Sequence, residues 1–205
     1  MKKLAISVAL CLLIARNAHA DSLCVDADHS SFRIRVETAG MLGALGHDHE
    51  IEAHGIKGCV EIDWTQLAES SVSLIFSTAD IQVLDPDHPK DRPKVQEAMA
   101  LEVLGIRDFP EIRFKSERVR PVVGRHALDT FPVTIDGVLT IRGHSQKVSI
   151  LLVLKQTSSN SAKVSGTYVL KQSDFGITPI RVMGGVVKVK DEIKLEFDLQ
   201  LWQSK

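Results

Sequence analysis

The sequence lacks the short motifs on which most enzyme classes depend. It contains no G-x-S-x-G nucleophile elbow, no H-E-x-x-H pattern and no phosphate-binding loop. Its paired glycines, Gly184 and Gly185, do not precede a helical pattern and so form no nucleotide-binding fingerprint. Serine, histidine and aspartate are abundant, so a triad assembled only by the fold stays open. We predict a protein that is not an enzyme and that requires no cofactor.

The sequence also lacks a basic run. Its 25 Lys and Arg residues nearly balance its 26 Asp and Glu residues. Lys2, Lys3 and Arg16 are the only charged residues among the first twenty, and without them the formal charge falls from −1 to −4. A net negative charge disfavours nucleic acid or an anionic membrane surface as the main partner. We therefore predict no nucleic-acid partner.

The apolar run over residues 4–15 is too short to span a bilayer. It follows Lys2 and Lys3 and precedes Ala18-His19-Ala20, which is a small-x-small cleavage pattern. Residues 1–20 are therefore expected to be a signal peptide that is cleaved after Ala20. The remaining residues, 21–205, are expected to form one exported domain, which in a bacterium would be periplasmic.

Only two cysteines remain after that cleavage, Cys24 and Cys59, and they lack C-x-x-C spacing. An isolated pair in an oxidising compartment typically forms a disulfide. If the first two strands pair antiparallel, both cysteines fall near the same end of the ladder. Because disulfide geometry is strict, a reactive or metal-binding thiol is the alternative.

Alternation of apolar and polar residues dominates the mature chain. Over residues 31–38, Phe32, Ile34 and Val36 share one parity and charged residues take most of the other, as in a half-buried strand. A second strand is expected over residues 46–62, with a bulge or kink at Gly55 where the apolar parity flips. Further strands are expected over residues 72–80, from 112 onward, and over 131–141, 148–154, 164–170 and 187–201.

Only the segment from Pro93 to Gly105 has a helical pattern, with Val95, Ala98, Met99 and Leu101 on its apolar side. About eight strands with short turns and one short helix indicate an all-β antiparallel barrel or sandwich, without repeats or an interdomain linker. The interior of such a barrel is either filled by side chains or holds one small ligand. The inward parity carries almost no charge, so a ligand there would be apolar.

Five short segments carry a recognisable set of motifs. They are residues 28–32 (DHSSF), Gly58 with Asp63, residues 109–116 (FPEIRFKS), residues 136–144 (DGVLTIRGH) and residues 173–176 (SDFG). In these segments and their order the chain resembles the YceI family of exported lipid-binding proteins, including its P-x-I-x-F-x-S and G-x-L-T-I-R-G patterns. The resemblance extends over nearly the whole mature chain.

This resemblance implies an extended, lipocalin-like, eight-stranded antiparallel barrel with one short helix around an apolar tunnel. It also implies that an isoprenoid-type lipid, such as a polyprenyl chain or a quinone tail, is the ligand, with peripheral membrane contact for lipid exchange. The residues predicted to line the cavity are Phe32, Ile34, Val36, Ile51, Leu74, Phe76, Met99, Phe114, Ile135, Leu139, Tyr168 and Phe175.

Where many relatives carry an F-x-G-x-F run, this chain has a histidine-containing G-H-D-H variant. Strand parity places His47 and His49 on the inward side with Ile51, and it places His54 in solvent. Three roles are open for the pair. One histidine could hydrogen-bond the backbone, with Asp48 fixing its tautomer, or the pair could contact a lipid headgroup at the tunnel mouth.

The third role is metal binding, because two imidazoles at i and i+2 on a strand project to one side. Asp48 and His54 have the wrong parity for a third ligand, so His88 or His29 would have to approach from elsewhere. The alternative function is accordingly a metal- or haem-binding periplasmic protein that uses His47 and His49.

Overall fold

The computed structural model describes residues 20–39, 47–124, 126–182 and 187–203. The predicted signal peptide (Ala20 apart), the glycine-rich residues 40–46 and the glycine pair 184–185 lie outside this part of the chain. Within it, no helix is both long enough and apolar enough to cross a membrane.

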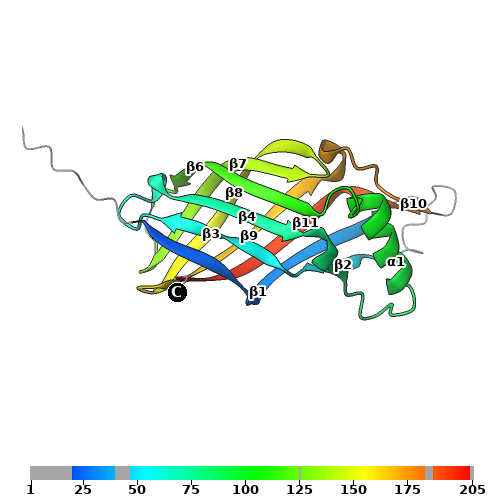
Figure 1. Ribbon diagram of the computed structural model, residues 1–205, viewed down its shortest axis with the longest axis horizontal. Coiled ribbons are helices and arrows are strands. Elements are labelled where there is room, and N and C mark those ends of the chain that lie inside the picture. The colour runs from blue at the N-terminus through cyan, green and yellow to red at the C-terminus, as the bar shows by residue number, and fades with distance from the viewer. Residues whose placement is uncertain (1–19, 40–46, 125, 183–186, 204–205) are drawn as a thin grey trace, which may run out of the picture.

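The described residues form a closed antiparallel β-barrel (Figure 1). Its strands are β1 (Asp21–Ala39), β2 (His49–Ala53), β3 (Ile56–Ile62), β4 (Ser71–Ser77), β5 (Ile81–Val83), β6 (Glu111–Pro121), β7 (Thr130–Ile141), β8 (His144–Ser158), β9 (Ser161–Lys171), β10 (Arg181–Val182) and β11 (Val187–Gln203). β2 with β3, and β4 with β5, act as single interrupted strands, and β10 only extends the edge beside β11. The predicted eight-stranded barrel with one short helix is therefore confirmed.

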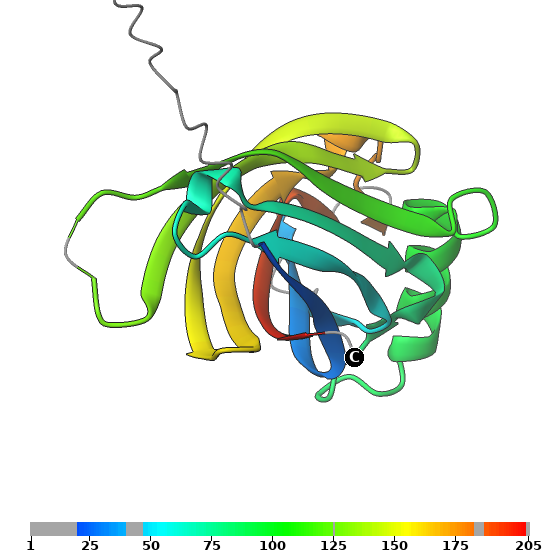
Figure 2. The same cartoon turned by 60° about the vertical axis from the view of Figure 1, so that its left-hand side comes forward.

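The two ends of the chain close the barrel by pairing β1 with β11 (Figure 2). In this ladder Phe32 lies opposite Phe197, and Ile34 lies opposite Leu195. Partners that face each other in a ladder point to the same side of the sheet, so apolar side chains of both strands meet in the interior. The alternation expected from the sequence thus becomes the inner wall.

The predicted second strand is interrupted at Gly55, where the apolar parity changes. Gly55 has a φ of +64°, and a Cβ there would lie 2.5 Å from Oδ2 of Asp80. His54 donates its backbone N–H to the Asp80 carbonyl at 2.9 Å instead of continuing the ladder. The kink lets β2 pair with one part of β1 and β3 with another.

The helix lies at one end of the elongated barrel (Figure 1). It consists of α1 (Arg92–Ala98), which has a proline in its first turn, and a π-helical continuation, η4 (Met99–Leu104), ended by the left-handed Gly105. The π-helical turn shifts the inward face: Met99 and Leu104 are buried, but Leu101 is 44% exposed. The prediction that Leu101 belongs to the apolar side was therefore wrong. Shorter 3₁₀ segments are η2 (Leu67–Glu69), η3 (Thr78–Asp80) and η5 (Gln172–Phe175).

The predicted disulfide between Cys24 and Cys59 is present and links β1 to β3. The two residues are direct partners in the β1–β3 ladder. Their sulfur atoms are bonded to each other, so neither is a free thiol that could bind a metal or react.

Candidate ligand cavity and histidine cluster

The barrel interior contains two apolar cavities. Cavity 1 has a volume of about 120 Å³, and its wall is apolar except for Ser70, Ser71 and Tyr168. Cavity 2 has a volume of about 130 Å³, and Gln172 is the one polar residue among the described residues that line it. The Gln172 side chain donates to the Lys190 carbonyl at 2.9 Å. Both cavities therefore offer a hydrocarbon-like surface.

Four residues line both cavities: Phe32, Phe76, Leu139 and Leu195. The rings of Phe32 and Phe76 meet edge to face, and Phe32 also stacks on Phe197 with centroids 5.8 Å apart. Because the same side chains form a wall of each cavity, the two cavities are neighbours inside the barrel. The aromatic pair forms the constriction between them.

The structure places eleven of the twelve predicted lining residues on these walls. Phe32, Phe76 and Leu139 line both cavities, Leu74, Phe114, Ile135 and Tyr168 line cavity 1, and Ile34, Val36, Ile51 and Met99 line cavity 2. Phe175 is the exception, because it lines neither cavity and is fully buried in η5, with 1% of its surface exposed. The φ-positive Gly176 ends η5 directly after it, and this local turn takes Phe175 out of the strand alternation.

Tyr168 belongs to the wall of cavity 1, and no polar atom of the described residues contributes to the surface of that cavity. Burial, together with the nearby charge of Asp174, raises the pKa of Tyr168, so the phenol is neutral at physiological pH. A neutral phenol does not oppose an apolar occupant as a phenolate would.

A cluster of three histidines, His47, His49 and His88, lies with Asp85 beyond cavity 2, on the same side of β2. We call it the histidine cluster. Val36 and Ile51 both line cavity 2, and His49 is the ladder partner of Val36. His49 therefore continues the inward face of β2, as the parity predicted, and its side chain is 15% exposed. His54, expected in solvent, has a 48% exposed side chain.

Asp85 lies beside both histidines of the pair, and no sequence pattern had singled it out as a site residue. Its carboxylate is 1% exposed, and its Oδ2 lies 2.7 Å from Nδ1 of His49. Its Oδ1 accepts the backbone N–H of Glu50 at 2.9 Å. The expectation that Asp48 fixes a histidine tautomer was wrong, because Asp48 accepts the backbone N–H of Thr38 at 2.9 Å.

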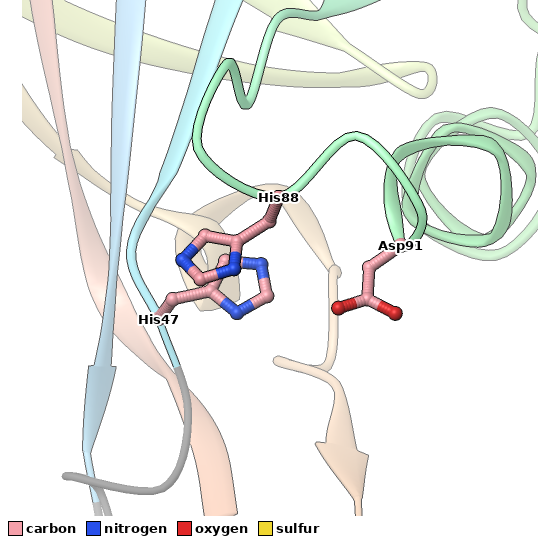
Figure 3. A group of neighbouring side chains, drawn as sticks. All are labelled: His47, His88 and Asp91. Carbon is pink, nitrogen blue, oxygen red and sulfur yellow. The ribbon is translucent and has the colours of Figure 1, made fainter.

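His47 lies among three other members of this cluster. Its ring stacks on that of His88 (Figure 3), with centroids 3.7 Å apart. It also meets the ring of His49 edge to face, with centroids 4.8 Å apart. Its Nε2 lies 3.9 Å from Oδ2 of Asp85, which is too far for a hydrogen bond. This nitrogen is buried and has no hydrogen-bond partner among the described residues.

Two groups in this cluster have the composition and spacing of metal ligands: His47, His49 and Asp85, and His47, His88 and Asp91. In each group the potential ligand atoms lie within 4.8 Å of one another. His88 thus reaches the predicted pair, whereas His29 does not. His29 is 75% exposed and lies 2.8 Å from the carboxylate of Asp26.

Comparison with known proteins gives one family and a set of similar structures. The model of the YceI-like domain matches residues 24–201. The fold resembles that of Burkholderia cenocepacia BcnA, with a TM-score of 0.65 and 19% identity over 86% of this chain and 98% of that one. Comparison with proteins of curated function finds no match.

Two further structures have the same fold. One is a polyisoprenoid-binding domain from Saccharophagus degradans, with a TM-score of 0.66 and 11% identity over 90% of this chain and 99% of that one. The other is the Campylobacter jejuni YceI protein, with a TM-score of 0.57 and 12% identity over 76% of this chain and 85% of that one. At these identities the likeness establishes the fold alone.

Proposed function

The chain belongs to the YceI-like domain family, and we propose that it is an exported carrier that holds an isoprenoid-type or similar amphiphilic lipid in its barrel. The single observation that carries this proposal is the apolar tunnel formed by cavity 1 and cavity 2. Apolar burial favours a hydrocarbon occupant roughly in proportion to the area removed from water. The tunnel wall offers few hydrogen-bonding groups for a polar ligand, so binding rather than catalysis is its expected role.

The size of the tunnel favours a flexible chain over a compact ligand. An apolar cavity of about 150 Å³ holds a molecule the size of benzene. Each half, at about 120 and 130 Å³, would therefore hold only one short segment of a lipid. A chain of linked isoprene units could occupy both halves in succession if Phe32 and Phe76 move aside.

The orientation of the lipid follows from the polarity of the tunnel ends. His47 and His49 continue the inward face of β2 beyond cavity 2, so they would contact the headgroup while the chain runs through cavity 2 and past Phe32 into cavity 1. The Saccharophagus degradans domain of the same fold is described as polyisoprenoid-binding, which is in keeping with this ligand class. A quinone tail belongs to the same chemical class.

Export is supported by the Cys24–Cys59 disulfide, because structural disulfides persist in oxidising compartments. It also agrees with the signal peptide expected over residues 1–20. We propose a periplasmic location and transient contact with a membrane surface, from which a lipid chain must be taken up and to which it must be delivered.

The proposal is tested by extracting the protein, purified from its natural compartment, with organic solvent and identifying the bound molecules by mass spectrometry. We expect about one isoprenoid-type lipid per chain. Recovery of no lipid, or only of lipids that also adhere to an unrelated exported protein, would contradict the proposal.

A matched pair of variants links the lipid to the tunnel. Leu139→Trp adds bulk where both cavities meet, whereas Leu151→Trp adds the same bulk to the outer face, where Leu151 is 60% exposed. We expect Leu139→Trp alone to lose the lipid while its circular-dichroism spectrum stays that of a barrel. Equal lipid content in the two variants would place the lipid outside the tunnel.

A further inference from the structure

The histidine cluster contains a polar atom that the protein itself does not satisfy. Nε2 of His47 is buried and lacks a hydrogen-bond partner among the described residues. Buried polar atoms nearly always find a partner, so an unsatisfied one calls for an explanation such as a bound ion. Oδ2 of Asp85, an oxygen of suitable chemistry, lies 3.9 Å away. That separation leaves room for a ligand shared by both atoms.

The surroundings of Asp85 indicate that the fold holds its carboxylate at a defined place next to His47. Its carboxylate is almost completely buried, and burial of a charged carboxylate is costly unless other groups compensate it. Its backbone has a φ of +27°, which non-glycine residues rarely adopt. The backbone N–H of Glu50 and the ring of His49 hold the carboxylate in place. The fold thus holds an anionic group beside three imidazole rings.

The chemistry of these donors selects the kind of ligand. Imidazole nitrogens together with a carboxylate suit Zn²⁺ and neighbouring divalent transition metals, whereas Ca²⁺ and Mg²⁺ prefer sites made of oxygens. We propose that His47, His49 and Asp85 bind one divalent transition-metal ion of the Zn²⁺ class, and that His88 covers it. This site does not depend on whether the tunnel holds a lipid.

The spacing of the donors fits such an ion after small side-chain rotations. With metal–ligand bonds of about 2.0–2.1 Å, tetrahedral geometry sets neighbouring ligand atoms about 3.3 Å apart. The His47–Asp85 separation of 3.9 Å is slightly longer than this value, and the His49–Asp85 contact of 2.7 Å is slightly shorter. The short contact is a hydrogen bond that the ion would replace or that would orient His49 as a ligand.

We assign the ion to the inner group, which consists of His47, His49 and Asp85, and not to the outer group of His47, His88 and Asp91. His49 and Asp85 are held by strand pairing and burial, so little order is lost when they bind an ion. His88 and Asp91 are exposed members of the loop before α1. The stacking of His88 on His47 places it over the inner group, where it can exclude water or supply a further nitrogen.

Such an ion would fasten a loop to the barrel wall. His49 belongs to β2, whereas Asp85 and His88 belong to the segment between β5 and α1. The backbone N–H of Leu84 already donates to the Glu50 carbonyl at 2.8 Å, which aligns the two segments. A metal bridge at this place would raise the thermal stability of the protein, because an ion that binds only the folded state stabilises it.

The test uses the whole protein, purified without a histidine tag and treated with a chelator that is then removed. Titration with ZnCl₂ in a calorimeter, and metal analysis after dialysis, are expected to give one Zn²⁺ per chain. The midpoint of thermal unfolding should rise with Zn²⁺ but not with Mg²⁺. His47→Gln and His49→Gln should each weaken Zn²⁺ binding at least tenfold.

His54→Gln is the matched control, because His54 follows the same strand but points to solvent. It should bind Zn²⁺ as the unaltered protein does. Equal uptake by the unaltered protein and His47→Gln would overturn the proposal. So would a result in which Asp91→Asn loses the ion and His49→Gln keeps it, because that places the ion in the outer group. A Soret band on addition of haem that disappears in His47→Gln would assign these histidines to haem instead.

Discussion

The rings of Phe32 and Phe76 meet edge to face, with centroids 4.9 Å apart and an interplanar angle of 67°, where cavity 1 adjoins cavity 2. Aromatic pairs in this arrangement attract each other beyond the effect of burial alone, by about 0.5–1.5 kcal/mol. That energy is small enough for the insertion of a hydrocarbon chain to offset it. The pair can therefore limit how far a lipid extends into the tunnel without sealing it.

Removal of one ring should lengthen the lipid that the protein retains. Phe32→Ala joins the two cavities, so we expect the bound isoprenoid chains to shift toward longer species in mass spectrometry of the extracted protein. The substitution should also cost about 3–5 kcal/mol in the free energy of unfolding, as large-to-small core changes do.

Phe109→Ala provides the control for this experiment. Phe109 is a half-buried aromatic residue that lines neither cavity and lies near Arg142, whose guanidinium carbon is 5.8 Å from its ring centroid. Phe109→Ala should lower the free energy of unfolding without changing the distribution of lengths among the bound lipid chains. The same shift in both variants would mean that general loosening, not the constriction, determines which lipid is held.

The disulfide should contribute substantially to stability because it closes a loop of 35 residues. A loop of this length corresponds to about 3–4 kcal/mol from reduced chain entropy of the unfolded state. The double variant Cys24→Ala/Cys59→Ala should lose about that much in urea denaturation. Dithiothreitol should destabilise the unaltered protein by a similar amount and leave the double variant unchanged. A large effect of the reductant on the double variant would show that it acts elsewhere.

The sequence could predict the barrel and most of its inner wall because period-two alternation directly reports which side chains share a face. Phe32, Ile34 and Val36 alternate with charged residues, and all three line a cavity. The same rule placed His49 inward and His54 outward. A local rule of this kind succeeds wherever a strand runs without interruption.

The sequence could not predict contacts that join distant, irregular segments. Asp85 and His49 are 36 residues apart, and Asp85 lies in a proline-containing loop that has no periodicity. The prediction that Leu101 lies on the apolar side of the helix was wrong for a related reason. The π-helical turn of η4 rotates its side chains away from the positions that an ordinary helical period gives. Both errors arise where tertiary structure overrides the local pattern.

The ion pair of Arg120 and Asp136 should make stability depend on pH in acid. Arg120 and Ser149 hydrogen-bond Asp136 and lower its pKa from 3.8 to about 2 in the folded protein. A depressed carboxyl pKa stabilises the fold above the unfolded value, and this contribution is lost as the pH falls from 3.8 toward 2. The stability difference between the unaltered protein and Asp136→Asn should thus be full at neutral pH and shrink through that window.

Glu117→Gln is the control for this pH dependence. Glu117 pairs with Lys147 at a longer distance of 3.4 Å, and both side chains are at least half exposed. Exposed pairs of this kind contribute little to stability, so urea denaturation should show a small effect of the substitution throughout. A stability difference for Asp136→Asn that stayed constant down to the lowest pH would contradict the assigned cause.

Gly137 in β7 connects a sequence motif to the shape of cavity 1. A Cβ at this position would lie 2.5 Å from the Lys115 carbonyl oxygen and 2.9 Å from the ring of Phe114, which lines cavity 1. The backbone oxygen cannot move without disturbing the β6–β7 ladder. Gly137→Ala should therefore cost about 1–3 kcal/mol in the free energy of unfolding, as overpacking does.

The substitution should also reduce lipid binding, because the added methyl group pushes the Phe114 ring toward the tunnel. Gly124→Ala is the control, since a Cβ there lies no closer than 3.3 Å to any atom, namely an atom of the exposed His126 ring. Denaturation and lipid extraction of both variants would separate the two effects. If Gly137→Ala lowered stability but kept the full lipid content, the role of Gly137 would be confined to strand packing, and the ring of Phe114 would not limit the space in cavity 1.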